Sequence, residues 1–398
     1  MGKRLVLVAL LALAAAVAFS LPAEGVTPIN NREYAPAVQQ LIQKARKSIW
    51  LQLYQTRFYE EYPNTITNFY LTDLIAAKQR GVDVKVLVDT GEWNPSQKNE
   101  YNLDYVDRLT TAGVEIWEDS PEDVSHQKVI LIDEAITVVS SNNWSYYSLA
   151  NNNEVGAIVY SPQVNAYFRE YFKERQKAGK PRANANHTTA AASNAKSLSA
   201  SDLPQYKKVP VADVHPIPNR LFYPAVHEAL LKARSIDVVQ RSIELQSGPP
   251  RVGRDALPGE PSSLVNVLVN DLILAHKRGA KVRVILDANE NFDSSRNAET
   301  AALLKQHGVP VFQEDLQVQT HAKLLVVDDD KVILGSTNWT TPAIESGNEA
   351  SVLITSPELN KVYKGYVENL LLSAGPFEAV AKNIWDAPTS GSKTSQTD

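Results

Sequence analysis

Two segments of the chain carry the same three residue types at the same spacing, His-x-Lys-x-x-x-x-Asp. They are His126, Lys128 and Asp133 in the first copy and His321, Lys323 and Asp328 in the second. Only seven histidines occur in the 398 residues, so two registered copies are far rarer by chance than one. Two imidazoles at one site can divide a group transfer between them, one as the nucleophile that forms a covalent intermediate and one as the acid that protonates the leaving group. A duplicated chain could bring both to one interface.

The register continues beyond each Asp. Further matching positions are Ser140, Ser141, Asn143, Trp144 and Glu154 after the first motif and Gly335, Ser336, Asn338, Trp339 and Glu349 after the second. A motif HxKxxxxD followed by GSxN resembles the phospholipase D superfamily. The resemblance covers both halves, from about Asn31 to about Leu372, and each feature below that depends on it is an expectation.

The resemblance implies a role for each repeated residue. His126 is expected to become phosphohistidine, while His321 acts first as acid and then as base. Charge that builds on the non-bridging phosphate oxygens is expected to be held by Lys128, Lys323, Asn143 and Asn338, with Ser141 and Ser336 as short donors near the phosphate. Glu154 and Glu349 are expected to orient the imidazole nitrogen that faces away from phosphorus, either within one half or across the interface between the halves. In the family the motif Asp tends to be structural, which favours a strand-pinning role for Asp133 and Asp328. No metal and no other cofactor is implied.

Structural explanations compete with several of these assignments. A single His on a buried strand is more often a core residue than a catalyst, and only the second registered copy reverses that expectation. Trp144 and Trp339 favour packing over substrate contact. One departure from the family pattern is visible, because Ser140 stands where the second copy has Gly335. If that position requires positive φ or a close backbone approach, a serine would strain the first half.

The elements that must position these residues also repeat. Residues 78–89 match residues 276–287, and each half alternates helical and strand patterns. In the first half the spacing predicts helices at 34–47, 65–79, 101–112 and 163–175, and strands at 48–54, 84–88, 114–117, 128–132 and 137–140. The second half repeats this from Tyr223 onward. The predicted fold class is therefore α/β, a duplicated α-β-α sandwich with two pseudo-symmetric halves and the active site at their interface.

Composition divides the chain into five predicted segments. They are a signal peptide at 1–20, a first half at 27–176, a flexible linker at 177–208, a second half at 209–386 and a disordered tail at 387–398. The first segment has Lys3 and Arg4 before an apolar run with small residues near its end, which predicts export to the periplasm or medium. The alternative is an uncleaved anchor helix. The chain contains no cysteine, which excludes disulfides and thiolate metal sites.

The substrate class is left open by the motifs alone. A formal charge of −5 gives no basic footprint of the kind that tracks nucleic acid, so nucleic acid is disfavoured as a partner. Export and the aromatic segment 54–62 favour a phospholipid substrate and transient contact with a membrane surface; the alternative for that segment is core and loop packing. The segment of residues 246–263 is either a lid, a headgroup selector or an exposed loop.

The predicted function is an exported phospholipase D-type phosphodiesterase that hydrolyses phospholipids and could transfer the phosphatidyl group to alcohols. An exported endonuclease and a phosphatidyltransferase of cardiolipin synthase type are the enzymatic alternatives. A lipid-binding or structural protein that kept the fold is the non-enzymatic one, and two intact motifs argue against it. Because both motifs lie in one chain, the functional unit is expected to be a monomer.

Overall fold

The computed structural model describes residues 20–91, 100–182, 200–203, 206–211, 213–246, 263–288, 295–314 and 316–377. The signal peptide predicted at 1–20 lies outside these ranges except for Ser20, and so does the tail predicted at 387–398. Most of the predicted linker also lies outside them. Among the helices of these ranges, none combines the length and the apolar character needed to cross a membrane.

The first half alternates strands and helices. Its elements are β1 (Gly25–Pro28), η1 (Asn31–Glu33), α2 (Tyr34–Lys44), β2 (Ser48–Leu53), α3 (Ile66–Gln79), β3 (Asp83–Val88), α4 (Glu100–Thr111), β4 (Glu115–Glu118), β5 (Lys128–Ile132), β6 (Ile136–Ser140), α5 (Tyr146–Ala150), β7 (Gly156–Tyr160), α6 (Pro162–Ala178) and β8 (Lys180–Pro181). The local sequence explains the boundaries. Ser161 caps α6 by accepting a hydrogen bond from the backbone of Val164, with Pro162 in the first turn. Past the end of α3, Gly81 has φ +86°, as a helix stop requires.

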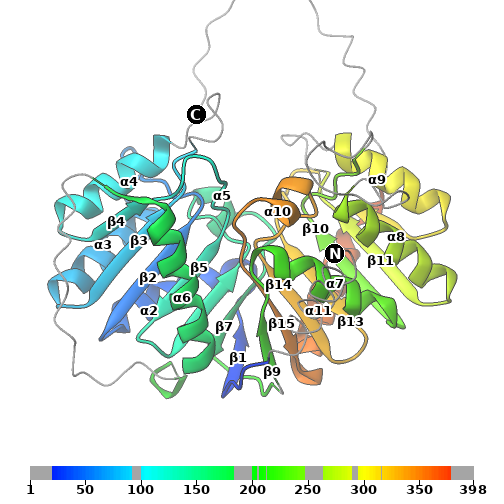
Figure 1. The fold of residues 1–398 in the computed structure, drawn as a ribbon, viewed down its shortest axis with the longest axis horizontal. Coiled ribbons are helices and arrows are strands. Elements are labelled where there is room, and N and C mark those ends of the chain that lie inside the picture. Colours follow the sequence, from blue (N-terminus) through cyan, green and yellow to red (C-terminus); the bar gives the residue numbers. More distant parts are fainter. Residues whose placement is uncertain are drawn as a thin grey trace, which may run out of the picture.

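The second half repeats this order. After η2 (Ala200–Asp202), its elements are β9 (Asp213–Pro216), η3 (Asn219–Leu221), α7 (Phe222–Leu231), β10 (Ser235–Gln240), α8 (Leu264–Lys277), β11 (Lys281–Leu286), α9 (Ser295–Gln306), β12 (Val311–Gln313), β13 (Lys323–Val327), β14 (Lys331–Gly335), α10 (Thr341–Glu345), β15 (Ser351–Thr355), α11 (Pro357–Ser373) and β16 (Gly375–Pro376). Ser356 and Pro357 start α11 as Ser161 and Pro162 start α6. The two halves stand side by side, the first in blue to green and the second in green to red (Figure 1).

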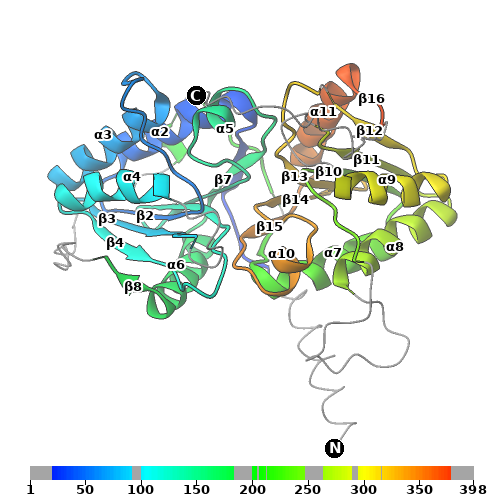
Figure 2. The ribbon, with the colours of Figure 1, turned by 90° about the horizontal axis from the view of Figure 1, so that it is seen from above.

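The two sheets have the same topology. The first has the strand order β1-β7-β6-β5-β2-β3-β4-β8, and the second, read in the same sense, has β9-β15-β14-β13-β10-β11-β12-β16. In each sheet three neighbouring strands run parallel, β2-β3-β4 and β10-β11-β12, and the remaining pairs are antiparallel. The mixed, duplicated α/β fold predicted from the sequence is confirmed, with helices packed against both faces of each sheet (Figure 2).

Three apolar clusters hold the molecule together. Two of them each belong to one half and pack α2, α3 and α4, or their counterparts α7, α8 and α9, against the outer face of a sheet. The third joins the halves, because it contains strand residues of both sheets together with α6 and α11. Along β5 the side chains alternate between the outer cluster, at Ile130, and the joining cluster, at Val129. Burial on both faces explains why the motif strands read as continuous apolar runs.

The predicted elements of the first half agree with the observed ones within a few residues at each end. The short strands β1 and β7 and the one-turn helix α5 are not among the predicted elements. The first sheet also extends past the predicted half 27–176 in both directions, since β1 begins at Gly25 and β8 lies at Lys180–Pro181 within the predicted linker. Strands as short as β1, β7 and β8, with four, five and two residues, carry little alternation that would distinguish them from loops.

Candidate active site

Each motif histidine is held at the start of a central strand by the other half of the molecule. The backbone N–H of His126 donates to the carbonyl of Asn348 at 2.8 Å, and that of His321 donates to Asn153 at 2.9 Å. These bonds belong to short parallel bridges that link Ser125 with Asn348 and Asn153 with Thr320. The structure therefore brings the two motifs together, and neither half can position its histidine alone.

The side chains cross between the halves in the same way. His126 Nδ1 lies 3.0 Å from both carboxylate oxygens of Glu349, and His321 Nδ1 lies 2.9 Å from Oε2 of Glu154. All four side chains are buried. A carboxylate on Nδ1 favours the tautomer that has its proton there, which leaves Nε2 of each ring to carry a lone pair or a second proton. Two imidazoles oriented in this way form the centre of the site.

The motif serines hold these carboxylates. Ser141 Oγ donates to Glu154 Oε2 at 2.5 Å, and Ser336 Oγ donates to Glu349 Oε2. Ser148 on α5 donates to the other oxygen of Glu154 at 2.6 Å. The sequence predicts Ser141 and Ser336 as donors near the phosphate or its binding loop, and the structure gives their hydroxyls another partner. They are placed to fix the carboxylate that orients the opposite imidazole.

A second repeated pair, which the sequence analysis missed, anchors the backbone beside each glutamate. The side-chain oxygen of Asn31 accepts the backbone N–H of Glu154, and that of Asn219 accepts the N–H of Glu349, both at 2.8 Å. Asn31 and Asn219 have φ 49° and 51°, a conformation that asparagine tolerates better than most residues. The signal was present, because each asparagine is followed by arginine and then by a helix.

The motif lysines lie beside the histidines on the same strand face. The ammonium of Lys128 donates to the carbonyl of His126 at 2.6 Å, and Lys323 donates to that of His321 at 2.5 Å. Burial lowers the pKa of Lys128 to about 7 and holds that of Lys323 well below its usual range, against the opposing effect of Glu154 and Glu349. Two desolvated cations side by side predict an anionic ligand, because an anion would restore their charge.

Burial also determines the protonation state of the site. It lowers the pKa of His126 to about 4 and that of His321 to about 3, and the neighbouring glutamates only partly oppose this shift. The pKa of Glu154 is lowered to about 2, because the effects of His321, Lys323 and Ser141 together outweigh desolvation. At neutral pH the site without a ligand therefore has two neutral imidazoles and an ionised Glu154, and Lys128 is only partly in its ammonium form.

The motif aspartates lie at the far end of the same strands. Asp133 follows β5 with φ 52°, and its carboxylate accepts the backbone N–H groups of Arg46, Lys47 and Ser48 at 2.7–3.0 Å. Asp328 accepts two such groups, from Arg234 and Ser235. Four strand residues separate each aspartate from its lysine. Although Asp133 and Asp328 belong to the repeated motif, the structure places them as strand-end anchors and not among the reacting groups.

The motif asparagines keep an unsatisfied amide. The side-chain oxygens of Asn143 and Asn338 are buried and have no hydrogen-bond partner among the residues that the structure describes. The oxygen and nitrogen of an amide exchange places when the side chain flips. The NH2 group of each asparagine can therefore occupy the unpartnered position and donate to a ligand. The same orphan group in both halves fits a pair of donors to the two non-bridging oxygens of a phosphate. Their role as phosphate ligands stays a prediction.

Residues 38–176 and 261–371, more than half of the chain, match the family model described as "Cardiolipin synthase, PLD-like domain". The chain belongs to the phospholipase D superfamily. Its structure resembles that of a phosphatidylserine synthase from Haemophilus influenzae Rd KW20, with a TM-score of 0.65 over 90% of this chain and 89% of the other. At 14% sequence identity that likeness shows the fold.

Curated relatives of this phospholipase D superfamily member cover single stretches of the chain. A mitochondrial cardiolipin hydrolase of Canis lupus familiaris is 30% identical over 168 residues, which is 36% of this chain and 62% of the relative. A phospholipase D of Rickettsia typhi is 28% identical over 139 residues, 35% of this chain and 60% of the relative. The chain thus spans less than two thirds of the length of each of these relatives.

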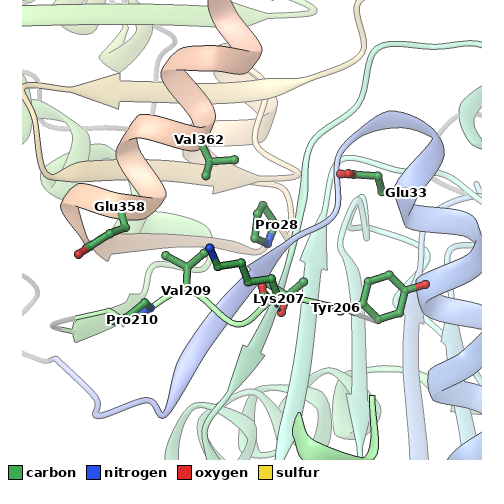
Figure 3. A pocket seen from close by; sticks show the side chains of 9 residues that line it. Pro28, Glu33, Tyr206, Lys207, Val209, Pro210, Glu358 and Val362 are labelled. Carbon is green, nitrogen blue, oxygen red and sulfur yellow. Dashed lines mark hydrogen bonds between the residues drawn. The ribbon is translucent and has the colours of Figure 1, made fainter. Parts of the chain in front are cut away.

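Other features of the superfamily member lie apart from the site. Trp144 and Trp339 are fully buried, which confirms the packing role predicted for them. A cavity of about 490 Å³ lies between β1, the segment 206–210 and α11, where Lys207 extends across it (Figure 3). No motif residue lines that cavity. Within the described ranges, no group of three His, Cys, Asp or Glu side chains is arranged to hold a metal ion.

Proposed function

We propose that the protein is an exported phosphodiesterase of phospholipase D type that hydrolyses phospholipids through a phosphohistidine intermediate. The observation that carries the proposal is the exchange of glutamates between the halves, which orients two imidazoles through Nδ1 beside two buried lysines. Superfamily membership supplies the reaction class. Export rests on the N-terminal sequence alone, and transfer of the phosphatidyl group to an alcohol is the same chemistry with another acceptor.

In the proposed reaction Nε2 of His126 attacks phosphorus, and the bond from phosphorus to the leaving oxygen breaks. His321 gives its Nε2 proton to that oxygen, so an alcohol departs and a phosphohistidine remains. His321 then takes a proton from water, whose oxygen attacks phosphorus and breaks the P–N bond. The products are a phosphate monoester and an alcohol, and both histidines return to their starting states.

The electrostatics of the site set one condition on this scheme. An acid must carry a proton, but burial lowers the pKa of His321 to about 3. The negative charge of a bound phosphodiester raises the pKa of both imidazoles, and Glu154 and Glu349 stabilise the imidazolium on the side away from phosphorus. Lys128 and Lys323, with Asn143 and Asn338, are proposed to hold the non-bridging oxygens, where charge develops in the transition state.

A surface of the first half supports a lipid substrate. The segment after β2 leads from the site to the half-buried Tyr59 and the exposed Tyr101. The guanidinium of Arg57 lies 5.0 Å from the ring centre of Tyr59 and 4.3 Å from that of Tyr101. The hydroxyl of Tyr59 accepts the backbone N–H of Tyr146, which is followed by Tyr147. We name these five residues the aromatic rim. Tyrosines around a cation suit the boundary between lipid headgroups and acyl chains.

The test gives the protein two substrate classes in parallel. Mixed phospholipid vesicles with ethanol and EDTA are incubated beside single-stranded DNA, and products are identified by mass spectrometry. Phosphatidic acid and phosphatidylethanol that disappear in His126→Ala and persist in His307→Ala support the proposal, since His307 lies outside the site. Cut DNA with intact lipid would replace it with an exported nuclease, and products from neither substrate would also overturn it.

The order of the two histidines has its own test. Acid quenching during turnover of a phosphorus-labelled substrate should trap labelled protein in the wild type and in His321→Asn, and none in His126→Asn. The opposite pattern would assign the attack to His321 and the proton transfer to His126. Because both rings have the same arrangement of carboxylate and lysine, this experiment separates roles that geometry alone leaves symmetric.

A further inference from the structure

The two halves differ at one position that borders the site. The last residue of β2 pairs with Lys128, and the last residue of β10 pairs with Lys323. The next residue is Tyr54 in the first half and Arg241 in the second. Equivalent backbone bonds follow, from Trp144 to Gln55 and from Trp339 to Ser242, so the two side chains occupy matching places.

Tyr54 covers the first motif. Its ring meets that of His126 edge-on with 4.6 Å between centres, and the ammonium of Lys128 lies 4.8 Å from the same ring centre. Burial raises the pKa of Tyr54 to about 12, so its phenol stays neutral. On the first-half side, the site is therefore bordered by an uncharged aromatic ring.

Arg241 is placed beside the second motif. Its backbone N–H donates to the carbonyl of Ala322 at 3.2 Å, between His321 and Lys323 in the sequence. Burial lowers the pKa of both residues most, and the charge of Arg241 adds to that effect. Arg241 itself interacts electrostatically with Asp287, Tyr54, Glu154 and Glu244. An arginine keeps its charge at any physiological pH. The second-half side of the site therefore carries a permanent cation that has no counterpart in the first half.

The charges of a phosphodiester do not require this third cation. A scissile phosphodiester carries one negative charge, and together with Glu154 and Glu349 it is balanced by the two lysines and by the imidazolium of the proposed acid, with two asparagine amides as further donors. We propose that Arg241 forms an anion subsite that binds a second phosphate on the substrate arm lying on the His321 side of the scissile phosphate. The inference rests on the proposed function, under which that arm belongs to the departing alcohol, because His321 protonates the leaving oxygen.

Such a subsite would also give the site a direction. With two equivalent motifs, a phosphodiester could bind in either orientation, and either histidine could attack. A second phosphate held by the planar, two-pronged guanidinium of Arg241, with Tyr54 on the opposite side, stabilises one orientation over the other. The bound arm is then the one that leaves, so the asymmetry selects both the substrate and the reacting bond.

The test compares two lipids that differ by this group. Cardiolipin releases an alcohol that still contains a phosphate, and phosphatidylglycerol releases one that contains none. Both are presented in otherwise identical vesicles to the wild type, Arg241→Gln and Arg234→Gln. Arg234 precedes the other end of β10 and is exposed, which makes it the matched control. Loss of a charged hydrogen bond should lower the ratio of kcat/KM for cardiolipin to that for phosphatidylglycerol about 10- to 100-fold in Arg241→Gln alone.

The remaining outcomes are distinct. An equal loss on both lipids would place Arg241 on the scissile phosphate and overturn the inference while leaving the proposed function intact. An unchanged ratio with full activity would overturn it as well. Turnover of bis(p-nitrophenyl) phosphate without turnover of either lipid would instead contradict the proposed lipid function. Cleavage of DNA that is lost in Arg241→Gln would overturn the lipid subsite and show that Arg241 binds a neighbouring phosphate of a nucleic acid.

Discussion

Ser140 lies directly opposite Gly156 on the neighbouring strand, and the second half has the same pair in reverse, Gly335 opposite Ser351. A Cβ added to Gly156 would lie 3.0 Å from that of Ser140. The first half therefore accommodates serine where the family pattern has glycine, because the residue opposite Ser140 on the neighbouring strand is glycine. The strain that the sequence suggests for Ser140 is absent, since its φ is not positive.

The exchange predicts unequal costs for alanine at the two glycines. In Gly335→Ala the new Cβ would approach the backbone oxygen of Ala350 to 2.3 Å, whereas in Gly156→Ala its nearest neighbour is a side-chain carbon at 3.0 Å. Gly335→Ala should lower the free energy of unfolding by about 3 kcal/mol and Gly156→Ala by about 1 kcal/mol. Chemical denaturation measures both.

A double mutant checks the physical reason. Ser140→Gly removes the Cβ that Gly156→Ala would contact, so the pair should be more stable than the sum of the single changes by about 0.5 kcal/mol or more. Strict additivity would show that the two positions do not interact, and would contradict this account of the exchange.

Removing a glutamate that crosses between the halves should impair catalysis more than folding. Glu349→Gln keeps the shape of the side chain and loses the charge that stabilises the imidazolium of His126. We expect kcat to fall about 100- to 10,000-fold in Glu349→Gln and in Glu154→Gln. Glu358→Gln on the exposed surface of α11 is the matched control. Circular dichroism and kcat on bis(p-nitrophenyl) phosphate are the measurements, and a loss confined to KM would contradict the orienting role.

The dependence of kcat/KM on pH follows from the buried histidines. Catalysis needs one neutral imidazole and one imidazolium, but the pKa of His126 is lowered to about 4 and that of His321 to about 3. The reacting complex therefore holds one proton more than the free site at neutral pH. We expect kcat/KM to rise as the pH falls from 7 toward 4, and to fall below that range when both rings become protonated. An optimum above pH 8 would contradict these protonation states.

Lys128 adds a second limb to the same profile. Burial lowers its pKa to about 7, so raising the pH through 7 removes the charge that we propose binds the phosphate, and the decline in kcat/KM should become steeper there. Lys128→Arg keeps the charge at high pH. The variant should lose this steeper segment while keeping the acidic limb, and a profile that still steepens near 7 would exclude Lys128 as its cause.

The repeat explains why much of the site could be predicted from sequence. His126, Lys128 and Glu154 each recur in register, and a strand between two apolar layers shows a continuous apolar run. The pairing of Glu154 with His321, and not with His126, depends on how the halves pack, and no local pattern contains that information. The same holds for Ser141, whose hydroxyl reaches a carboxylate fixed by tertiary structure. Arg241 could not be predicted from the repeat because the two halves differ at that position. Its place beside the site follows only from the strand registers of the structure.

The aromatic rim predicts a separable contribution to vesicle binding. The side chain of Tyr147 is 67% exposed and that of Tyr146 is 45% exposed, so Tyr147→Ser should leave the fold intact. Its loss should weaken binding to phospholipid vesicles about three- to tenfold, because less apolar surface enters the interface. Leu372→Ser on α11, 85% exposed, is the control. Cosedimentation measures binding, and equal effects of the two variants would show that the rim has no special role.

The motif aspartates provide the clearest separation of stability from catalysis. Asp133 is fully buried, accepts three backbone N–H groups and has positive φ. Asp133→Ala leaves those donors without an acceptor and should lower the free energy of unfolding by about 3–5 kcal/mol, whereas Asp133→Asn, which keeps one oxygen and tolerates the backbone conformation, should lower it by about 1–3 kcal/mol. Because Asp133 lies at the opposite end of β5 from His126, the folded fraction of Asp133→Asn should retain kcat within about threefold. A loss of kcat comparable to that of Glu349→Gln, in protein that denaturation shows to be folded, would show that Asp133 takes part in the reaction.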